Sequence, residues 1–172
     1  MNNGMVQKEQ DGSRVLDTTA IEKLLLEDCI PYIESHYRVR TDKWSRAMAG
    51  LSMGSMQTSQ VTLKNPDLFG YAGVFSGFVA AFKIGQTAPD TTYLKELDDK
   101  EKFQKDFKVF FRACGETDYV ALERFEKDRE LFREKGLAPE ECPTHVEKMY
   151  HGEHEWNVWR MCLRDFAQNL FR

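Results

Sequence analysis

The pentapeptide Gly50-Leu51-Ser52-Met53-Gly54 constrains the fold of this chain more than any other stretch of its sequence. A short apolar run over residues 46–51 leads into it, and a polar, helix-forming stretch over residues 56–64 follows. A G-x-S-x-G motif between a strand and a helix is typical of a sharp, strained turn that raises the serine hydroxyl above a sheet. Side chains two residues to either side of the serine would collide in such a turn, which explains Gly50 and Gly54.

Ser52 has two interpretations. As a helix N-cap between two turn glycines it would be purely structural. The flanking strand and helix favour the other interpretation, a nucleophile on an exposed turn. Because the same turn opens a helix, the backbone N–H of Met53 is predicted to be free to donate to an oxyanion beside Ser52.

The apolar spacing divides the rest of the chain into alternating helices and strands. Residues 1–17 are polar with turn signals, and we expect a loop there. Residues 20–35 show helical spacing after a capping box formed by Thr19 and Glu22, and Pro31 predicts a kink or break near residues 27–29. Strands are expected at residues 46–51, at 71–77, which has the pattern of a buried strand, at 109–114, and at 144–150, which shows alternation. Further helices are expected at residues 56–64, from residue 120 to a C-cap at Gly136, and at residues 156–171. Between the second and third strands, residues 78–98 are expected to form a loop or small lid with a short helix.

This order of elements predicts an α/β fold. Strands that alternate with helices form parallel sheets with helices on both faces. A length of 172 residues suits one domain with a sizeable core. We therefore divide the chain into a leader over residues 1–17 and an α/β domain over residues 18–172.

The candidate catalytic residues follow the strands of this predicted sheet. The carboxyl ends of parallel strands share one edge, where catalytic groups gather in the loops. Ser52 follows the first predicted strand, Asp118 the third and His154 the fourth. At this edge His154 would take the proton of Ser52 and return it to the leaving alcohol, while Asp118 would orient the imidazole and stabilise its positive charge. Two alternatives stay open at this point: Glu116 for the acid, although Asp118 is favoured over it, and His151 for the histidine.

The composition argues against several functions. The net charge of −4 comes from 28 acidic and 24 basic residues spread along the chain, which does not suggest nucleic acid or a membrane as a partner. No stretch has the length and apolarity of a membrane helix, and residues 1–5 lack the features of a signal peptide. The four cysteines never form C-x-x-C, so zinc and redox chemistry are not expected. Cys29, Cys114 and Cys162 are expected to be buried thiols.

The remaining histidines and two tryptophans have simpler interpretations. His36 and His145 lie at the wrong places for the catalytic edge and are expected to be surface or packing residues. Trp159 is expected in the core because a tryptophan at helical spacing usually is buried. Trp156, beside His154, is the candidate to stack on a sugar or aromatic ring of a substrate.

Four segments of the chain resemble one protein family. They are the helix before the nucleophile turn over residues 30–37, the nucleophile segment Arg46-Ala47-Met48-Ala49-Gly50-Leu51-Ser52-Met53-Gly54, the acid loop over residues 113–118 and the histidine loop over residues 152–159. Together they resemble the putative-esterase family of α/β hydrolases, nearest the feruloyl and acetyl xylan esterases of carbohydrate esterase family one, with enterochelin esterases and esterase D more distant. The resemblance covers about residues 26–159, and it implies Asp118 as the acid and His154 rather than His151 as the histidine.

The chain departs from this family in two places. Ser55 stands where family members usually have another glycine. The larger departure is at the front, where the family implies about four further strands, so the chain resembles the C-terminal half of a catalytic domain. In the family the front half gives a second oxyanion donor, which leaves the Met53 N–H within this chain. The strand that ends at Leu51 would then be an unpaired apolar edge, and we expect a homodimer or higher oligomer joined there.

The resemblance implies a serine carboxylesterase that hydrolyses ester substituents of plant cell-wall polysaccharide through an acyl-enzyme, without a metal or organic cofactor. It implies a carbohydrate-linked ester as substrate, no nucleic acid or membrane partner, and an extracellular or periplasmic location. Two alternatives remain. One is a catalytically impaired esterase fragment that serves as an oligomerising or binding module, and the other is an esterase or thioesterase acting on a small ester or a siderophore.

Overall fold

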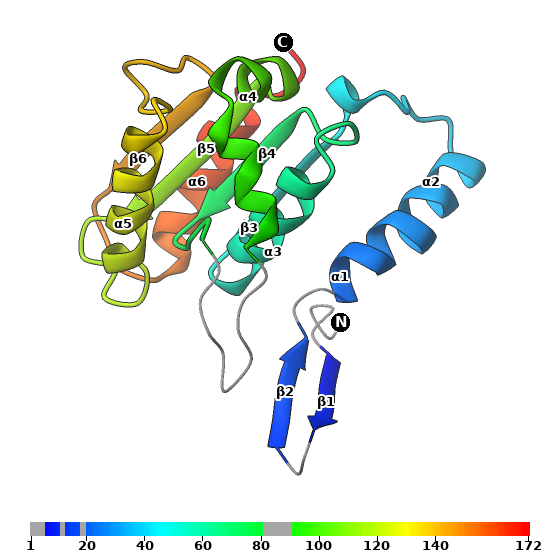
Figure 1. The fold of residues 1–172 in the computed structure, drawn as a ribbon, viewed down its shortest axis with the longest axis horizontal. Helices are drawn as coiled ribbons and strands as arrows, with labels where there is room; N and C mark the ends of the chain where they lie inside the picture. The colour runs from blue at the N-terminus through cyan, green and yellow to red at the C-terminus, as the bar shows by residue number, and fades with distance from the viewer. Residues whose placement is uncertain (1–5, 11–12, 18–19, 81–90) are drawn as a thin grey trace.

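A parallel four-stranded sheet forms the centre of the molecule in the computed structural model, which describes residues 6–10, 13–17, 20–80 and 91–172 (Figure 1). Its strands are β3 (Ala47–Leu51), β4 (Tyr71–Phe75), β5 (Val109–Gly115) and β6 (His145–Tyr150). They lie in the order β3-β4-β5-β6, and every neighbouring pair is parallel. The predicted α/β class and its four strands are thus confirmed.

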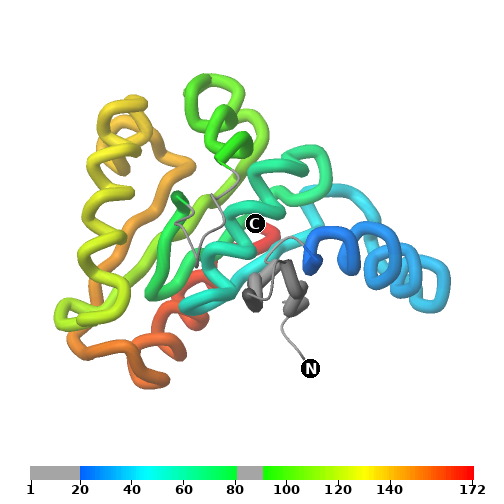
Figure 2. Tube along the Cα trace, turned by 60° about the horizontal axis from the view of Figure 1, so that its bottom comes forward, coloured from blue at the N-terminus to red at the C-terminus, as the bar shows by residue number. Residues whose placement is uncertain are grey.

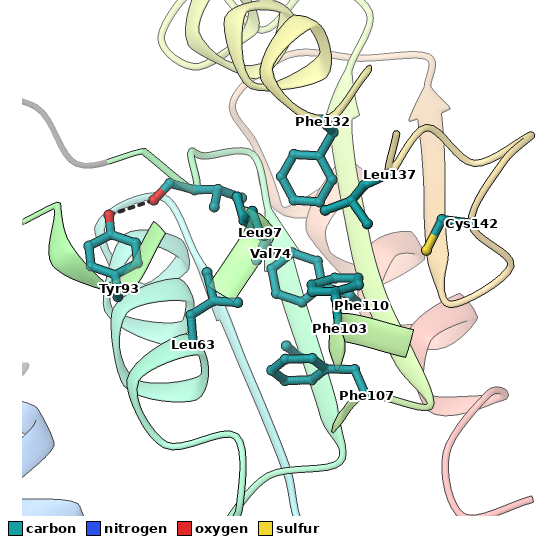
Figure 3. Close-up of a cluster of buried hydrophobic side chains, with 12 residues drawn as sticks. Leu63, Val74, Tyr93, Leu97, Phe103, Phe107, Phe110, Phe132, Leu137 and Cys142 are labelled. Atoms are coloured by element: carbon teal, nitrogen blue, oxygen red, sulfur yellow. Dashed lines mark hydrogen bonds between the residues drawn. The ribbon is translucent and has the colours of Figure 1, made fainter. Parts of the chain in front are cut away.

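Helices cover both faces of this sheet. The helix α6 (Trp156–Ala167) packs on one face, while α3 (Met53–Lys64), α4 (Lys100–Asp106) and α5 (Leu122–Glu134) pack on the other. Successive side chains of β5 point to opposite faces. Accordingly Phe111 joins the cluster under α6, while Phe110 joins the cluster under α4 and α5, where it lies close to Phe103 and Phe132 (Figure 3).

The helix α3 is buried although its sequence is polar. Every residue from 55 to 63 is buried. The Ser59 hydroxyl donates to the Ser55 carbonyl at 3.0 Å, and the Thr62 hydroxyl donates to the Thr58 carbonyl at 2.8 Å. Such bonds within the helix satisfy polar side chains that would otherwise lose water without replacement.

The N-terminal prediction of a loop over residues 1–17 is wrong for two segments. The strands β1 (Val6–Gln10) and β2 (Ser13–Asp17) pair antiparallel, with Gln10 opposite Ser13. Asp11-Gly12, which links the two strands, is a strong hairpin signal that sequence analysis interpreted only as a turn. The strands were missed because a hairpin ladder bonds backbone groups and does not require apolar side chains.

The predicted helix over residues 20–35 is present and interrupted. It consists of α1 (Ala20–Lys23), a π-helical turn η1 (Leu24–Cys29) and α2 (Ile30–His36). Proline cannot donate the regular helical bond, and a π-turn before it absorbs the mismatch. The predicted interruption near residues 27–29 is confirmed. Thr19 of the proposed capping box lies outside the described residues, and Glu22 instead pairs with Lys64 on α3 at 3.4 Å.

The connection between β4 and β5 contains one helix more than the sequence indicated. The expected short helix is the 3₁₀ helix η3 (Thr92–Asp98), while residues 81–90 lie outside the described part of the chain. The helix α4 was not predicted, because Phe103 is the single buried residue on it. Asp99 caps this helix by accepting a hydrogen bond from the Lys102 N–H at 2.9 Å. A short 3₁₀ helix, η2 (Lys43–Ser45), precedes β3.

Candidate active site

Ser52 occupies a strained turn between β3 and α3. Its φ of 53° and ψ of −122° lie outside the conformations that residues with side chains usually adopt. A Cβ atom at Gly50 would overlap the carbonyl oxygen of Gly54, which explains the first glycine of the motif as predicted. No such collision explains Gly54, where a Cβ atom would meet nothing within 4 Å apart from its chain neighbours and the adjoining backbone of its own helix. The requirement for glycine therefore comes from the strand side of the turn.

The loops after β3, β5 and β6 bring three predicted side chains together. The Nε2 atom of His154 lies 3.0 Å from the Oγ atom of Ser52. The Nδ1 atom of the same ring lies 3.0 Å from both carboxylate oxygens of Asp118. This geometry allows one imidazole to accept the serine proton while the carboxylate fixes its tautomer.

Asp118 is fully buried and its charge is well supported. The backbone N–H groups of Val120 and Ala121 donate to its Oδ1 atom at 3.1 and 2.9 Å. Burial raises the pKa of Asp118, but the hydrogen bonds from His154 and from the Ala121 N–H outweigh that effect, so the pKa lies below its usual value. The carboxylate is therefore ionised at neutral pH.

The two alternative residues lie away from this arrangement and contact each other. The Nδ1 atom of His151 lies 3.5 Å from a carboxylate oxygen of Glu116, and both side chains are exposed. Exposed pairs of this kind contribute little to stability. The structure thus brings Asp118 and His154, rather than Glu116 and His151, to Ser52.

Sequence reasoning missed the contact between the buried Asp118 carboxylate and Cys114. The Sγ atom of Cys114, near the end of β5, lies 3.7 Å from the Oδ2 atom of Asp118. Burial and the neighbouring charge of Asp118 raise the pKa of this thiol to about 12, so it stays protonated and donates. The sequence predicted a buried thiol correctly, but the direction of its side chain could not be read from an apolar run.

Ser55, the departure from the family pattern, ties the nucleophile turn to the loop after β4. Its hydroxyl donates to the Ser52 carbonyl and accepts a hydrogen bond from the Phe78 N–H at 3.2 Å. A Cβ atom at Gly77 would overlap the same hydroxyl. The loop after β4 therefore packs directly against the turn that carries Ser52.

The surroundings of the imidazole are aromatic on one side. The ring of Trp159 lies edge-on to His154 with centroids 5.1 Å apart, and Trp156 lies edge-on to Trp159 at the same distance. Trp159 is partly buried and packs against the core under α6, in line with the core prediction. Trp156 is 72% exposed, so most of its ring is accessible beside the histidine loop.

Met53, the predicted oxyanion donor, begins α3, and its N–H therefore has no acceptor within the helix.

The histidines assigned to packing or surface positions occupy those positions. His145 is buried and His36 is exposed.

Within the part of the chain that the structure describes, no group of three or more His, Cys, Asp or Glu residues could hold a metal ion. Nor does any helix in those residues have the length and apolarity to cross a membrane. Of the cysteines, Cys114 and Cys162 are buried as expected, Cys29 is only partly buried, and all are free thiols.

Comparison with known proteins gives one family and a consistent fold. The family model described as "Putative esterase" matches residues 7–169. The endo-1,4-beta-xylanase/feruloyl esterase of Xylanibacter ruminicola is 35% identical over 151 residues, which cover 88% of this chain and 18% of that protein.

Two solved structures illustrate the fold. The CE1 ferulic acid esterase of Anaeromyces mucronatus matches with a TM-score of 0.68 and 23% identity, over 88% of this chain and 53% of that one. The feruloyl esterase module of Clostridium thermocellum matches with a TM-score of 0.67 and 15% identity, over 93% of this chain and 61% of that one. The chain thus spans somewhat over half the length of these structures, and at such identities the likeness establishes the fold alone.

Proposed function

The chain belongs to the "Putative esterase" family, and on that premise we propose that it is a serine carboxylesterase of the feruloyl or acetyl xylan esterase type. Its substrates are ester substituents of plant cell-wall polysaccharide. The observation that carries the proposal is the hydrogen-bonded series from Ser52 through His154 to Asp118. The similarity to a xylanase/feruloyl esterase supports the substrate class.

The proposed mechanism has two halves. The Ser52 oxygen attacks the ester carbonyl while the Nε2 atom of His154 takes its proton, and the Met53 N–H donates to the developing oxyanion. His154 then protonates the leaving alcohol, which leaves an acyl group on Ser52. Water, deprotonated by the same imidazole, attacks this acyl-enzyme and releases the acid. Asp118 stays ionised throughout, as its lowered pKa requires, and stabilises the imidazolium.

We assign Trp156 to substrate contact. Its ring is largely exposed next to the histidine loop, and an aromatic face there can pack against a sugar or a phenolic acyl group.

The experiment that tests this function compares the wild-type chain with Ser52→Ala. Wild-type protein should be labelled covalently by a fluorophosphonate and should hydrolyse p-nitrophenyl acetate, whereas the variant should do neither. Ser35→Ala, which removes an exposed serine hydroxyl of α2, is the matched control and should behave as wild type. Equal labelling of the Ser52 variant would remove this residue from the mechanism. The rates of hydrolysis of methyl ferulate, acetylated xylan and a thioester are then compared to identify the preferred substrate.

We further propose that this chain forms a homodimer or higher oligomer through the free edge of β3. Among the described strands, β3 pairs only with β4, and the α1–α2 arm projects beside it, on the side of the sheet away from β6 (Figures 1 and 2). No residue of α1, η1 or α2 is buried. Large apolar side chains between 43% and 59% exposed gather along this arm and just after it: Leu24, Tyr32, Ile33, Tyr37 and Val39.

A second copy of the chain is the occupant that fits this surface. Open strand edges and large apolar patches are the features that associate in water. A pocket of about 390 Å³ lies between the arm and β3, lined by residues that include Ile33 and Met48. Sedimentation velocity at micromolar concentration should show a dimer or larger species, and Tyr32→Glu should shift it toward monomer. A monomeric wild-type chain would contradict the proposal.

A further inference from the structure

A second pocket, of about 550 Å³, lies at the end of the sheet opposite to Ser52. Tyr71, which lines it, is the first residue of β4, and Lys108, also in its lining, directly precedes β5. Ser52, in contrast, follows the last residue of β3. With a rise of about 3.3 Å per residue, the two ends of a five-residue strand lie roughly 15 Å apart. The pocket is therefore distinct from the catalytic edge.

The charges around this pocket are predominantly positive. Its basic lining residues are Arg40, Lys108 and Arg172, and all three are exposed. The Nζ atom of Lys108 lies 5.4 Å from the ring centroid of Trp44, which forms another part of the wall. Asp42 is the acidic residue of the lining, and its carboxylate is engaged by the Trp44 N–H and the Ser45 hydroxyl, each at 3.0 Å. A negatively charged ligand is the complement of this lining.

An aromatic pair forms one side of the pocket. Tyr71 is 1% exposed, so its ring belongs to the core that closes this side. Phe171 packs edge-on against the Tyr71 ring at 5.3 Å and is itself 56% exposed at the rim. Its φ of 58° is unusual for an aromatic residue.

We propose that this pocket binds a carboxylate-bearing sugar, a uronic acid unit of the polysaccharide. The choice of polysaccharide rests on the proposed function. Guanidinium groups bind carboxylates with paired hydrogen bonds, and Lys108 adds a second positive charge beside Arg40. Trp44 supplies an apolar wall for the sugar ring.

The charge of the whole chain strengthens this assignment. The net charge of −4 repels an acidic polymer at long range. A local positive site can hold an acidic polymer against this repulsion. The pocket supplies that site away from the reacting ester, and it thereby separates the binding of the polymer from the hydrolysis of its substituents.

The test measures binding with the Ser52→Ala variant, so that its result does not depend on turnover. The protein is titrated calorimetrically at low ionic strength with a xylo-oligosaccharide that carries one glucuronic acid and with a neutral xylo-oligosaccharide of the same length. The acidic ligand should bind more tightly by up to about fivefold for each ion pair, because the basic side chains are exposed and exposed pairs are weak. Adding Lys108→Gln and Arg40→Gln should remove the difference, whereas adding Lys127→Gln on the exposed surface of α5 should keep it.

Three results would overturn the inference: equal affinity for the acidic and neutral ligands, an unchanged preference in the Lys108 and Arg40 variants, or equally strong displacement by inorganic phosphate. The last of these would mean that the pocket binds small anions without recognising a sugar. A failure of the proposed function shows separately, as a lack of fluorophosphonate labelling of Ser52 in the wild-type chain. A failure of the proposed function is therefore distinguishable from a failure of this inference.

Discussion

Acidification should destabilise this fold through one buried imidazole, that of His145. The ring is the first side chain of β6, 2% exposed, with Phe132 against it at 4.5 Å between centroids. Its Nδ1 atom bonds the Leu137 carbonyl at 2.7 Å. Burial, and then the positive charge of Arg112, lower the pKa of His145 from 6.5 to about 3, so the folded state keeps this ring neutral.

The sign and size of the effect follow from proton linkage. Between the unfolded pKa of 6.5 and the folded pKa of about 3, the unfolded chain binds a proton that the folded chain does not. The free energy of unfolding therefore falls as the pH drops through this window. At about pH 5 the pH lies roughly 1.5 units below the unfolded pKa, and at about 1.36 kcal/mol per unit the loss relative to neutral pH is about 2 kcal/mol. Burial raises the pKa of Asp128 and of Glu96, so the contribution of His145 is isolated by comparing wild type with a variant of this residue over the same window.

Urea unfolding of the wild-type chain and of His145→Asn, at about pH 7 and pH 5, measures this loss. The asparagine amide can still donate to the Leu137 carbonyl, and the side chain at position 145 then no longer titrates in this range. Its stability should therefore change by about 2 kcal/mol less than that of wild type between the two conditions. His36→Asn, at an exposed position, should reproduce the wild-type difference. If wild type and His145→Asn lose the same amount on acidification, the buried neutral imidazole is not the cause.

Three further substitutions test the site and its support. Asp118→Asn should lower the turnover of p-nitrophenyl acetate about 10⁴-fold with an unchanged circular dichroism spectrum, because the wrong histidine tautomer is stabilised. Gly50→Ala should destabilise the chain by about 3 kcal/mol or more in urea, since the new methyl group overlaps the Gly54 carbonyl. Asp128→Ala should cost about 3–5 kcal/mol by the same assay, because the 3% exposed carboxylate faces the buried Arg112 and accepts two backbone N–H groups of the loop after β4. A loss below about 1 kcal/mol would contradict that role.

The strands of this fold were predictable because strands that lie in the core need apolar side chains. The first three segments are short, mainly apolar runs, which mark strands covered on both faces, and residues 144–150 show the alternation of a strand that is less fully covered. The helix α4 and the hairpin of β1 and β2 lack that requirement. One buried phenylalanine, Phe103, anchors α4, and a hairpin is held by backbone bonds that leave no apolar pattern. Sequence patterns therefore report the core more faithfully than the elements around it.

The common edge of the candidate site residues was predictable from topology, whereas their contacts were not. Parallel strands put the loops after β3 and β6 at one edge, but these are the first and last strands of the described sheet, so the loop after β6 must reach across the edge to bring His154 to Ser52. The choice between Glu116 and Asp118 depends on which carboxylate turns inward, and two residues of spacing do not encode that. The contact of Cys114 with Asp118 depends in the same way on the register at the end of β5.

The position of the three side chains is set by an extension of the sheet rather than by free loops. The Ser52 N–H donates to the Phe75 carbonyl at 3.0 Å, so the nucleophile turn continues the ladder between β3 and β4. At the other side of the sheet, the Glu116 N–H donates to the Tyr150 carbonyl at 2.8 Å, which joins the acid loop to the end of β6.

The glycines at this edge complete the same arrangement. A Cβ atom at Gly115 would overlap the Gly152 carbonyl, which shows how closely the acid and histidine loops approach. The Thr117 N–H and hydroxyl both donate to that same carbonyl, at 3.1 and 3.0 Å. Catalytic groups held by a rigid backbone need little reorganisation when the substrate arrives. The backbone bonds of Ser52, Glu116 and Thr117 therefore hold the three loops in place, and the separation between Ser52 and His154 should be insensitive to substitution of exposed side chains such as that of Glu116.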